Sequence, residues 1–93
     1  MAKALDKVTV AVIARNEEAT LADLLTMVAS RAADVILIDG HSTDRTAEIA
    51  ASMEIPVYRD GGRGKGDGIR RAIEVAGGEV VVFIDADGSH DPA

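Results

Sequence analysis

The feature that most constrains the fold is a short apolar run that leads straight into acidic residues. Val80 to Ile84 is followed at once by Asp85, Ala86 and Asp87. An unbroken run of β-branched and aromatic residues, without polar alternation, is typical of a strand buried on both faces in a parallel sheet covered by helices. We therefore predict a strand over 80–84, with the carboxylates on a loop at its carboxyl end.

Three earlier segments repeat this pattern of an apolar run followed by polar residues. We predict strands over Val8–Ile13, Val35–Ile38 and Pro56–Tyr58. The proline favours a strand start or a place near the edge of the sheet. The short connections and the alternation of strands with helical segments predict an α/β fold, with a parallel four-stranded sheet and helices on both faces.

Helices are expected between these strands. The first has an apolar face at Leu21, Leu24, Leu25 and Val28. Asn16 is a candidate N-cap for it, and Glu17 and Glu18 suit the positive end of the helix dipole. A second helix, capped by Ser42, Thr43 or Asp44, is predicted to run to about Met53. The third, with an apolar face at Ile69, Ala72, Ile73 and Ala76, is expected to end at Gly77-Gly78.

Length and composition narrow the functional classes. Ninety-three residues make one small domain, and the net charge of −6 argues against non-specific nucleic-acid binding. The chain has no cysteine, which excludes a disulfide scaffold and a thiolate metal site. Its apolar runs are far shorter than the roughly 20 residues of a spanning helix, and no signal peptide is recognisable. We expect a cytoplasmic location.

Every conspicuous polar cluster follows a predicted strand. They are Arg15-Asn16-Glu17, Asp39-Gly40-His41, the glycine-rich segment 61–68 and Asp85-Ala86-Asp87. Parallel α/β sheets bind ligands outside the carboxyl ends of their strands, so one site can use all four clusters. Two aspartates one residue apart offer hard oxygen ligands to Mg²⁺ or Mn²⁺, although Asp is also common in turns and caps.

The glycine-rich segment matches neither of the two common phosphate-binding patterns, G-x-G-x-x-G and Walker A. This mismatch weighs against a dehydrogenase that transfers hydride and against an ATPase. Half of the Lys and Arg residues fall within thirteen positions: Arg59, Arg63, Lys65, Arg70 and Arg71. This cluster is either a solvated loop and helix face or the counter-charge for a phosphorylated ligand. His41 and His90 are interpreted as surface or hydrogen-bonding residues.

Four ordered motifs carry a family resemblance that covers nearly the whole chain. They are residues 14–18 (ARNEE), 38–46 (IDGHSTDRT), 64–67 (GKGD) and 85–92 (DADGSHDP). In order and spacing they resemble the N-terminal half of family 2 glycosyltransferases with the GT-A fold, especially polyprenyl-phosphate and dolichol-phosphate mannosyl- and glucosyltransferases. The resemblance implies a Rossmann-like three-layer sandwich, and we expect strand order 3-2-1-4. Residues 1–93 would be the nucleotide-sugar-binding half, with the acceptor half and any general base absent.

The resemblance also assigns site residues. Ile13, Arg15, Glu17 and the turn Asp39-Gly40 would hold the base and ribose, with Lys65 close to the nucleotide. Asp85 and the neighbouring Ala86 would lie near the ribose and the metal, with Asp85 as one metal ligand. Asp87 would be the main Mg²⁺ or Mn²⁺ ligand and would take part in catalysis through the metal. Ser89 would be a weak third ligand. The cation would neutralise charge on the departing nucleoside diphosphate.

Three positions depart from the family pattern. Ile13 replaces the usual proline, and Ser89 replaces the Gln found as a metal ligand in dolichol-phosphate mannose synthases. Gly40 replaces the second Asp of the common Asp-Asp-Gly-Ser turn, which removes a frequent uracil contact. GDP-mannose is therefore favoured over a UDP-sugar as the donor, with a lipid phosphate as the acceptor.

The expected function is donor binding in an inverting, metal-dependent glycosyltransferase that acts in the cytoplasm or at the cytoplasmic face of a membrane. Two alternatives stay open. One is a nucleotidyltransferase, which would want a basic, glycine-rich loop after the first strand, where this chain has none. The other is a non-catalytic module that binds nucleotide or self-associates. With strand order 3-2-1-4, the run 80–84 becomes an exposed edge, so we expect a homo-oligomer through it.

Overall fold

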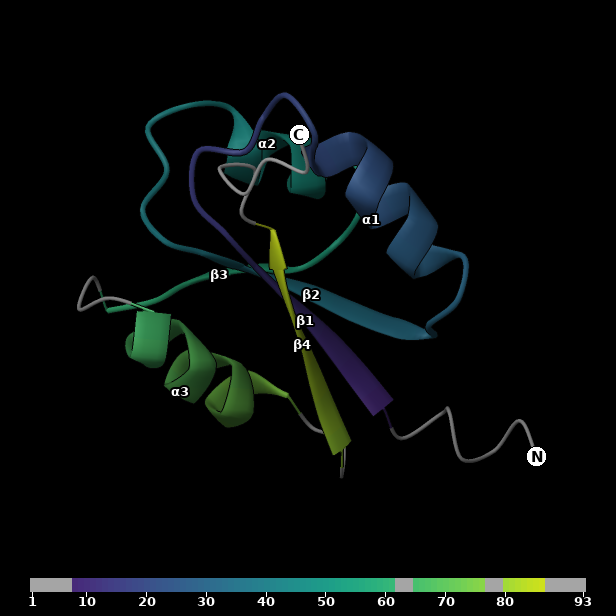
Figure 1. Cartoon of the computed structure of the whole chain (residues 1–93), viewed down its shortest axis with the longest axis vertical. Helices are drawn as coiled ribbons and strands as arrows, with labels where there is room; N and C mark the ends of the chain where they lie inside the picture. Colours follow the sequence, from purple (N-terminus) through teal and green to yellow (C-terminus); the bar gives the residue numbers. More distant parts are fainter. Residues whose placement is uncertain (1–7, 62–64, 77–79, 87–93) are drawn as a thin grey trace, which may run out of the picture.

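A computed structural model describes residues 8–61, 65–76 and 80–86, with the backbone alone for Lys65 and Val80. Four strands alternate with three helices (Figure 1). The strands are β1 (Val8–Ala14), β2 (Asp34–Asp39), β3 (Val57–Arg59) and β4 (Val80–Ala86). The helices are α1 (Leu21–Ala29), α2 (Thr46–Ser52) and α3 (Lys65–Val75). The predicted α/β class is confirmed.

The strands form one parallel sheet in the order β3-β2-β1-β4, which confirms the expected topology. β1 lies between β2 and β4, with Ile13 opposite both Ile38 and Asp85. β3 is a short edge strand beside the end of β2, as the proline before it predicted. Because all strands are parallel, their carboxyl ends meet at one edge of the sheet.

Helices cover both faces of the sheet, α1 and α2 on one and α3 on the other (Figure 1). An apolar cluster holds the helices to each face. On one face, α1 and α2 pack on the sheet through Leu21, Leu25, Val28 and Ala50, against strand residues that include Val12 and Leu37. On the other face, Ala72 of α3 packs against Ala11, Ile36 and Ile38. The alternation of strand side chains between these layers builds the three-layer sandwich.

β4 lies at the edge of the sheet, as the strand order 3-2-1-4 predicted for the run 80–84. Val82 and Phe83 are 43% and 38% exposed, so the burial on both faces that its apolar sequence indicates is not reached in this chain. The strand is also longer than predicted, since Asp85 and Ala86 pair with Ile13 and Ala14 of β1. The ladder continues as far as β1 supplies partners, so Asp85 belongs to the strand and not to the following loop.

The predicted apolar face of α3 is only partly right. Ala72 is buried, but Ile69 and Ile73 are exposed. The helix presents Gly68 to the sheet, where a Cβ would lie 3.5 Å from Ile13 Cγ2 and 3.6 Å from Ile38 Cγ2. Because glycine has no side chain, the helix can lie close to the sheet with Gly68 facing it. In this orientation Ile69 and Ile73 point outward. The helix also begins at Lys65, inside the segment expected to be a glycine loop.

The predicted cap of α1 is wrong. α1 begins at Leu21, after Thr20, and Asn16 lies in a separate loop with a φ of 55°. Glu17 and Glu18 precede the helix, and the acidic residue of its first turn is Asp23.

The start of α2 agrees in part with its prediction. Arg45 occupies the N-cap position of α2 and makes no side-chain capping bond. Asp44, one of the three expected caps, accepts the N–H of Thr46, the first residue of the helix, at 2.9 Å.

Candidate functional site at the carboxyl edge of the sheet

The loops that follow β1, β2 and β3 meet at the carboxyl edge of the sheet. Gly40 N–H donates to Ala14 O at 2.9 Å, and Asp60 N–H donates to Asp39 O at 3.2 Å. A Cβ on Gly40 would lie 3.5 Å from Arg15 Cβ and 3.6 Å from Asp60 Oδ2. The structure therefore brings together two of the four predicted clusters, Arg15-Asn16-Glu17 and Asp39-Gly40-His41, and places Asp60, the residue before the glycine-rich segment, beside them. Asp85 lies two strands from Asp39 in the same sheet.

The loop after β1 (residues 15–20) and the loop after β2 (residues 40–45) are joined by hydrogen bonds. Three consecutive N–H groups, of Asn16, Glu17 and Glu18, donate to side chains on the β2 side. Their acceptors, in order, are Ser42 Oγ at 2.9 Å, Thr46 Oγ1 at 2.8 Å and Asp44 Oδ2 at 3.2 Å. In return, Asn16 Oδ1 accepts the N–H of Thr43 at 2.8 Å and that of Asp44 at 3.3 Å. We call this set the loop junction.

Asp39 is fully buried beneath the loop junction. Its Oδ1 accepts the Ser42 hydroxyl at 2.5 Å and the Ser42 N–H at 3.2 Å. Its Oδ2 lies 3.7 Å from Nε of Arg59. A buried carboxylate needs such partners, because the desolvation of an unpaired charge is costly. The side chain expected to contact a nucleotide thus faces inward, and the exposed part of this turn is formed by its neighbours.

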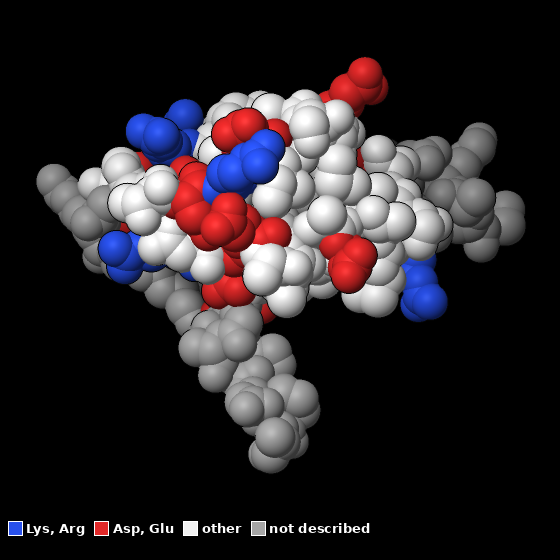
Figure 2. All heavy atoms as spheres, turned by 90° about the horizontal axis from the view of Figure 1, so that it is seen from above, with Lys and Arg blue, Asp and Glu red and all other residues white. Residues whose placement is uncertain are grey.

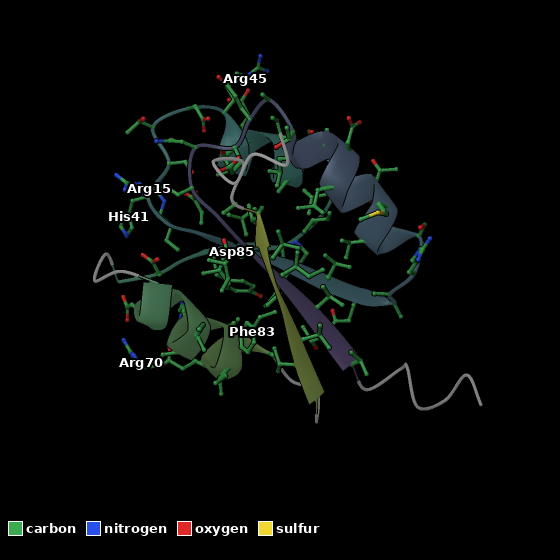
Figure 3. All side chains as sticks on the ribbon, viewed as in Figure 1. Arg15, His41, Arg45, Arg70, Phe83 and Asp85 are labelled. Atoms are coloured by element: carbon green, nitrogen blue, oxygen red, sulfur yellow. The ribbon has the colours of Figure 1, made fainter. Side chains whose placement is uncertain are left out.

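His41 ties the β2 loop to the loop after β3. It has a φ of 64°, a left-handed conformation that is uncommon outside glycine. Its Nε2 lies 2.8 Å from Asp60 O and 3.3 Å from Asp60 Oδ1. The interpretation of His41 as a hydrogen-bonding residue is confirmed. Figure 3 shows Arg15 and His41 on the same side of the molecule, with Asp85 at the tip of β4.

The described part of the basic cluster is bound within the protein. Arg70 donates to Asp67 Oδ1 at 2.7 Å and to Glu74 Oε2 at 2.9 Å, and its pKa is raised by this bond and by both charges. Arg71 donates to Arg59 O at 3.2 Å and lies over the Tyr58 ring. Arg70 is therefore bound within α3 and Arg71 connects α3 to β3, which favours the structural interpretation for both.

Asp67 occupies the first turn of α3 and is buried. A Cβ on Gly61 would collide with its carboxylate, so glycine at position 61 leaves room for this acid. The sequence motif Gly64-Lys65-Gly66-Asp67 therefore contains a residue that packs inward. Asp67 was not among the predicted site residues, and its spacing of three from Arg70 was the available signal.

Several predicted site residues can be placed and others cannot. Arg15 is exposed, Glu17 and Ile13 are half-buried, and Asp85 is exposed at the end of β4. Ala86 is buried beside them. Asp87, Ser89 and His90, like the side chain of Lys65, lie outside the described residues. Within residues 8–61, 65–76 and 80–86, no three His, Asp or Glu side chains group closely enough to hold a metal ion.

The face above the strand ends is rich in acidic side chains (Figure 2). Red carboxylates gather near its middle, with Lys and Arg side chains beside them. Partial desolvation raises the pKa of one of these acids, Asp44, but hydrogen bonds from the side chain and backbone of Thr46 and from the Glu18 N–H outweigh it. The net pKa of Asp44 is lowered, so this carboxylate is held in its charged form as part of the loop junction.

A three-layer parallel α/β domain with its polar loops gathered at the carboxyl edge of the strands is built to bind a ligand there. A sequence model of the family described as Glycosyl transferase family 2 matches residues 9–93. The chain therefore belongs to glycosyltransferase family 2. Within residues 8–61, 65–76 and 80–86, no helix is both long and apolar enough to cross a membrane.

Two relatives illustrate the likeness. Glycosyltransferase AglJ of Haloferax volcanii is 36% identical over 78 residues, which are 82% of this chain and 26% of that protein. Glucosyl-3-phosphoglycerate synthase of Mycobacterium tuberculosis, solved with Mg²⁺ and UDP, superimposes with a TM-score of 0.81 at 30% identity, covering 92% of this chain and 35% of that one. The same synthase solved with Mn²⁺, UDP-glucose and phosphoglyceric acid gives the same score. The chain thus spans about a quarter to a third of the proteins it matches.

Proposed function

We propose that this chain forms the donor site of a metal-dependent glycosyltransferase and binds a nucleoside diphosphate sugar. The observation that carries the proposal is the convergence of the three loops at the carboxyl edge, with the exposed carboxylate of Asp85 at the end of the adjacent strand β4. In this arrangement Arg15 and Glu17 on one loop, and Gly40 on the next, border the base and ribose. Lys65, at the start of α3, is placed near the nucleotide.

Charge supports the need for a divalent cation. The face above the strand ends is rich in acidic side chains (Figure 2). Asp85 lies at the end of β4, and the loops after the other strands contain Glu17, Glu18, Asp44 and Asp60. A diphosphate approaching this face meets like charge unless a cation lies between them. Asp85 and Asp87, with Ser89 as a weaker donor, would supply hard oxygen ligands that suit Mg²⁺ or Mn²⁺. The synthase that resembles this chain was solved with each of these ions.

The proposed reaction is inverting hexosyl transfer to a polyprenyl phosphate or a similar acceptor. The acceptor oxygen forms a bond to the anomeric carbon while the bond from that carbon to the nucleoside diphosphate breaks. A bound cation supplies charge neutralisation for the departing diphosphate. The chain's own residues hold the donor in place. A phosphate acceptor is already ionised and can react without a general base.

Gly40 supports GDP-mannose as the first choice of donor. A side chain there would make only ordinary van der Waals contacts, at 3.5 Å or more from its neighbours, and no left-handed φ demands glycine. Packing therefore leaves position 40 free to vary. The common family residue at this position is an Asp that contacts uracil, and its absence disfavours UDP. The structurally similar synthase binds UDP-glucose, so both bases must be compared.

Calorimetric titration of the chain with GDP, UDP, GDP-mannose and UDP-glucose, with and without Mn²⁺, tests the proposal. We expect Mn²⁺-dependent binding that Asp87→Ala abolishes. Glu54→Gln is the matched control, because Glu54 is an exposed acid in the connection between α2 and the amino end of β3, at the opposite edge of the sheet. Binding that persists without metal in Asp87→Ala would remove the role given to Asp87. Failure of every nucleotide to bind would overturn the donor site.

The same titration on variants of Gly40 tests which base the site prefers. Gly40→Asp should raise the affinity for UDP relative to GDP, whereas Gly40→Ala, which adds only a Cβ, should leave the ratio unchanged. An unchanged ratio in Gly40→Asp would contradict the role of this position in base selection.

We also infer that the chain self-associates through β4. Its outer edge pairs with no other described strand, and Val82 and Phe83 on the strand and Ile69 and Ile73 on α3 are exposed. An exposed apolar edge strand is a template for pairing with another chain. Light scattering at micromolar concentration should detect a dimer or larger species, and a monodisperse monomer would contradict this inference.

A further inference from the structure

Ser42 occupies a special position in the loop junction, because its hydroxyl is used in both directions. It donates to the buried Asp39 Oδ1 at 2.5 Å and accepts the N–H of Asn16 at 2.9 Å. A serine hydroxyl has one hydrogen to donate and can accept in return, so this geometry links a carboxylate inside β2 to the backbone of the loop after β1. The other acceptors of the junction do not contact Asp39.

We propose that Ser42 is a positioning residue for the donor site. Its hydroxyl transmits the fixed position of the Asp39 carboxylate to Asn16, and so places Arg15 and Glu17, the two neighbours of Asn16. The inference rests on the proposed function, which assigns Arg15 and Glu17 to the base and ribose. It adds that the position of these two residues is set from the neighbouring strand, across 26 residues of sequence.

The backbone at Asn16 has a φ of 55°, in the left-handed region. Asparagine adopts this region more readily than most L-residues, because its side chain can hydrogen-bond to nearby groups. Asn16 is also exposed, so burial does not fix it. Its N–H is held by Ser42, and its side chain is held by the N–H groups of Thr43 and Asp44. Removing the hydroxyl of Ser42 leaves the backbone N–H of Asn16 without this acceptor, while the Asn16 side chain keeps its hydrogen bonds.

The loss of the hydroxyl has two consequences. Asn16 N–H loses its acceptor, and Asp39 loses its shortest hydrogen bond while keeping the Ser42 N–H and Arg59. Hydrogen bonds to charged groups stabilise more than neutral ones. We therefore expect Ser42→Ala to weaken nucleotide binding about tenfold. The Asp39 carboxylate should stay in place, because two of its contacts remain.

Amide hydrogen exchange and calorimetry on the same variants test the proposal. In Ser42→Ala, the Asn16 amide should exchange faster, whereas amides of the sheet interior, such as that of Val12, should exchange at the wild-type rate. UDP with Mn²⁺ and GDP with Mn²⁺ serve as the binding probes. Ser42→Thr keeps a hydroxyl and should restore both slow exchange and affinity.

The matched control is Thr43→Ala, which removes only a 3.4 Å side-chain contact to Asn16 Oδ1 and keeps the Thr43 N–H bond. It should leave exchange and affinity near wild type. If Thr43→Ala weakens binding as much as Ser42→Ala does, the effect belongs to any change in the loop and the proposal is overturned.

The remaining outcomes separate this inference from the proposed function. An unchanged Asn16 exchange rate in Ser42→Ala overturns the coupling between the loops. Faster exchange with unchanged nucleotide affinity overturns the positioning role. If the wild-type chain binds neither nucleotide, the proposed donor site fails and the role of Ser42 in binding fails with it, while the exchange data still decide whether Ser42 joins the two loops.

Discussion

β2 and β4 have similar sequences and opposite surroundings. Each is an apolar run that ends in aspartate, Val35–Asp39 in β2 and Val81–Asp85 in β4. Every residue from Val35 to Asp39 is buried, because β2 has a strand on each side and helices on both faces. β4 is at the edge, and Asp85 is exposed. The local sequence therefore sets the strand, whereas the neighbouring strands and helices decide whether the terminal carboxylate is buried or exposed.

The largest expected difference between the two strands is in stability. Leu37→Ala in β2 removes a fully buried side chain and should lower the free energy of unfolding by about 3 kcal/mol. Val82→Ala in β4 should cost the monomer less than about 1 kcal/mol, because this side chain is 43% exposed in the single chain. Urea denaturation at a protein concentration at which the chain is monomeric measures both. Self-association through β4 would cover this side chain, so the cost of Val82→Ala should rise with protein concentration; equal losses in the monomer would contradict the prediction.

A smaller effect compares two left-handed residues at opposite edges of the sheet. Glu54, after α2, has a φ of 63° with Ile55 N–H donating to Ala50 O, the geometry in which helices usually place glycine. Glu54→Gly should stabilise the fold by about 0.5–1 kcal/mol. His41→Gly relieves the same strain but removes the contact with Asp60, so its gain should be smaller. Thermal denaturation compares them, and an equal gain would show that the His41 contact contributes nothing.

The smallest expected effect is on the pH dependence of stability, and it arises at Asp44 in the loop after β2. The pKa of Asp44 is lowered from its ordinary value of 3.8 in the folded chain. Folding therefore gains from its ionisation, and this gain is present above the unfolded pKa and lost as the pH falls through the folded one. Asp44→Asn should lose less stability than the wild type on acidification, measured by denaturation from pH 6 down to about pH 2. Asp23→Asn on α1 is the control, and identical curves for Asp44→Asn and wild type would contradict the prediction.

Much of the fold follows from local patterns. The four apolar runs, the spacing of Leu21, Leu25 and Val28, and the family motifs predicted the sheet, its order and the first helix. These features depend on alternation and helical period, which a sequence displays directly. The rotation of α3 about its axis could not be predicted. Gly68 faces the sheet because the helix approaches Ile13 and Ile38 closely there, and this proximity is visible only in the packed structure.

The site was predicted by location more than by contact. The polar clusters were expected at the strand ends and the first two of them meet there, but the partners of Asn16 and Asp39 were missed. Asn16 binds groups that lie 26 residues away in the chain or further, and single-sequence reasoning has no signal for such pairs. The Ser42 partner of Asp39 lies only three residues away. The spacing of Asp39 and Ser42 was the nearest available hint, since Asp often bonds to a nearby backbone N–H.

The pairing of Asp85 with Ile13 within the sheet has a consequence for affinity. A carboxylate on a free loop must be ordered when a ligand binds, at a cost of roughly 1–2 kcal/mol for each residue whose backbone is fixed. The backbone of Asp85 is already ordered by β1. A cation or ribose hydroxyl that reaches this carboxylate therefore meets a residue whose backbone entropy was lost during folding, so binding there does not carry this part of the ordering cost.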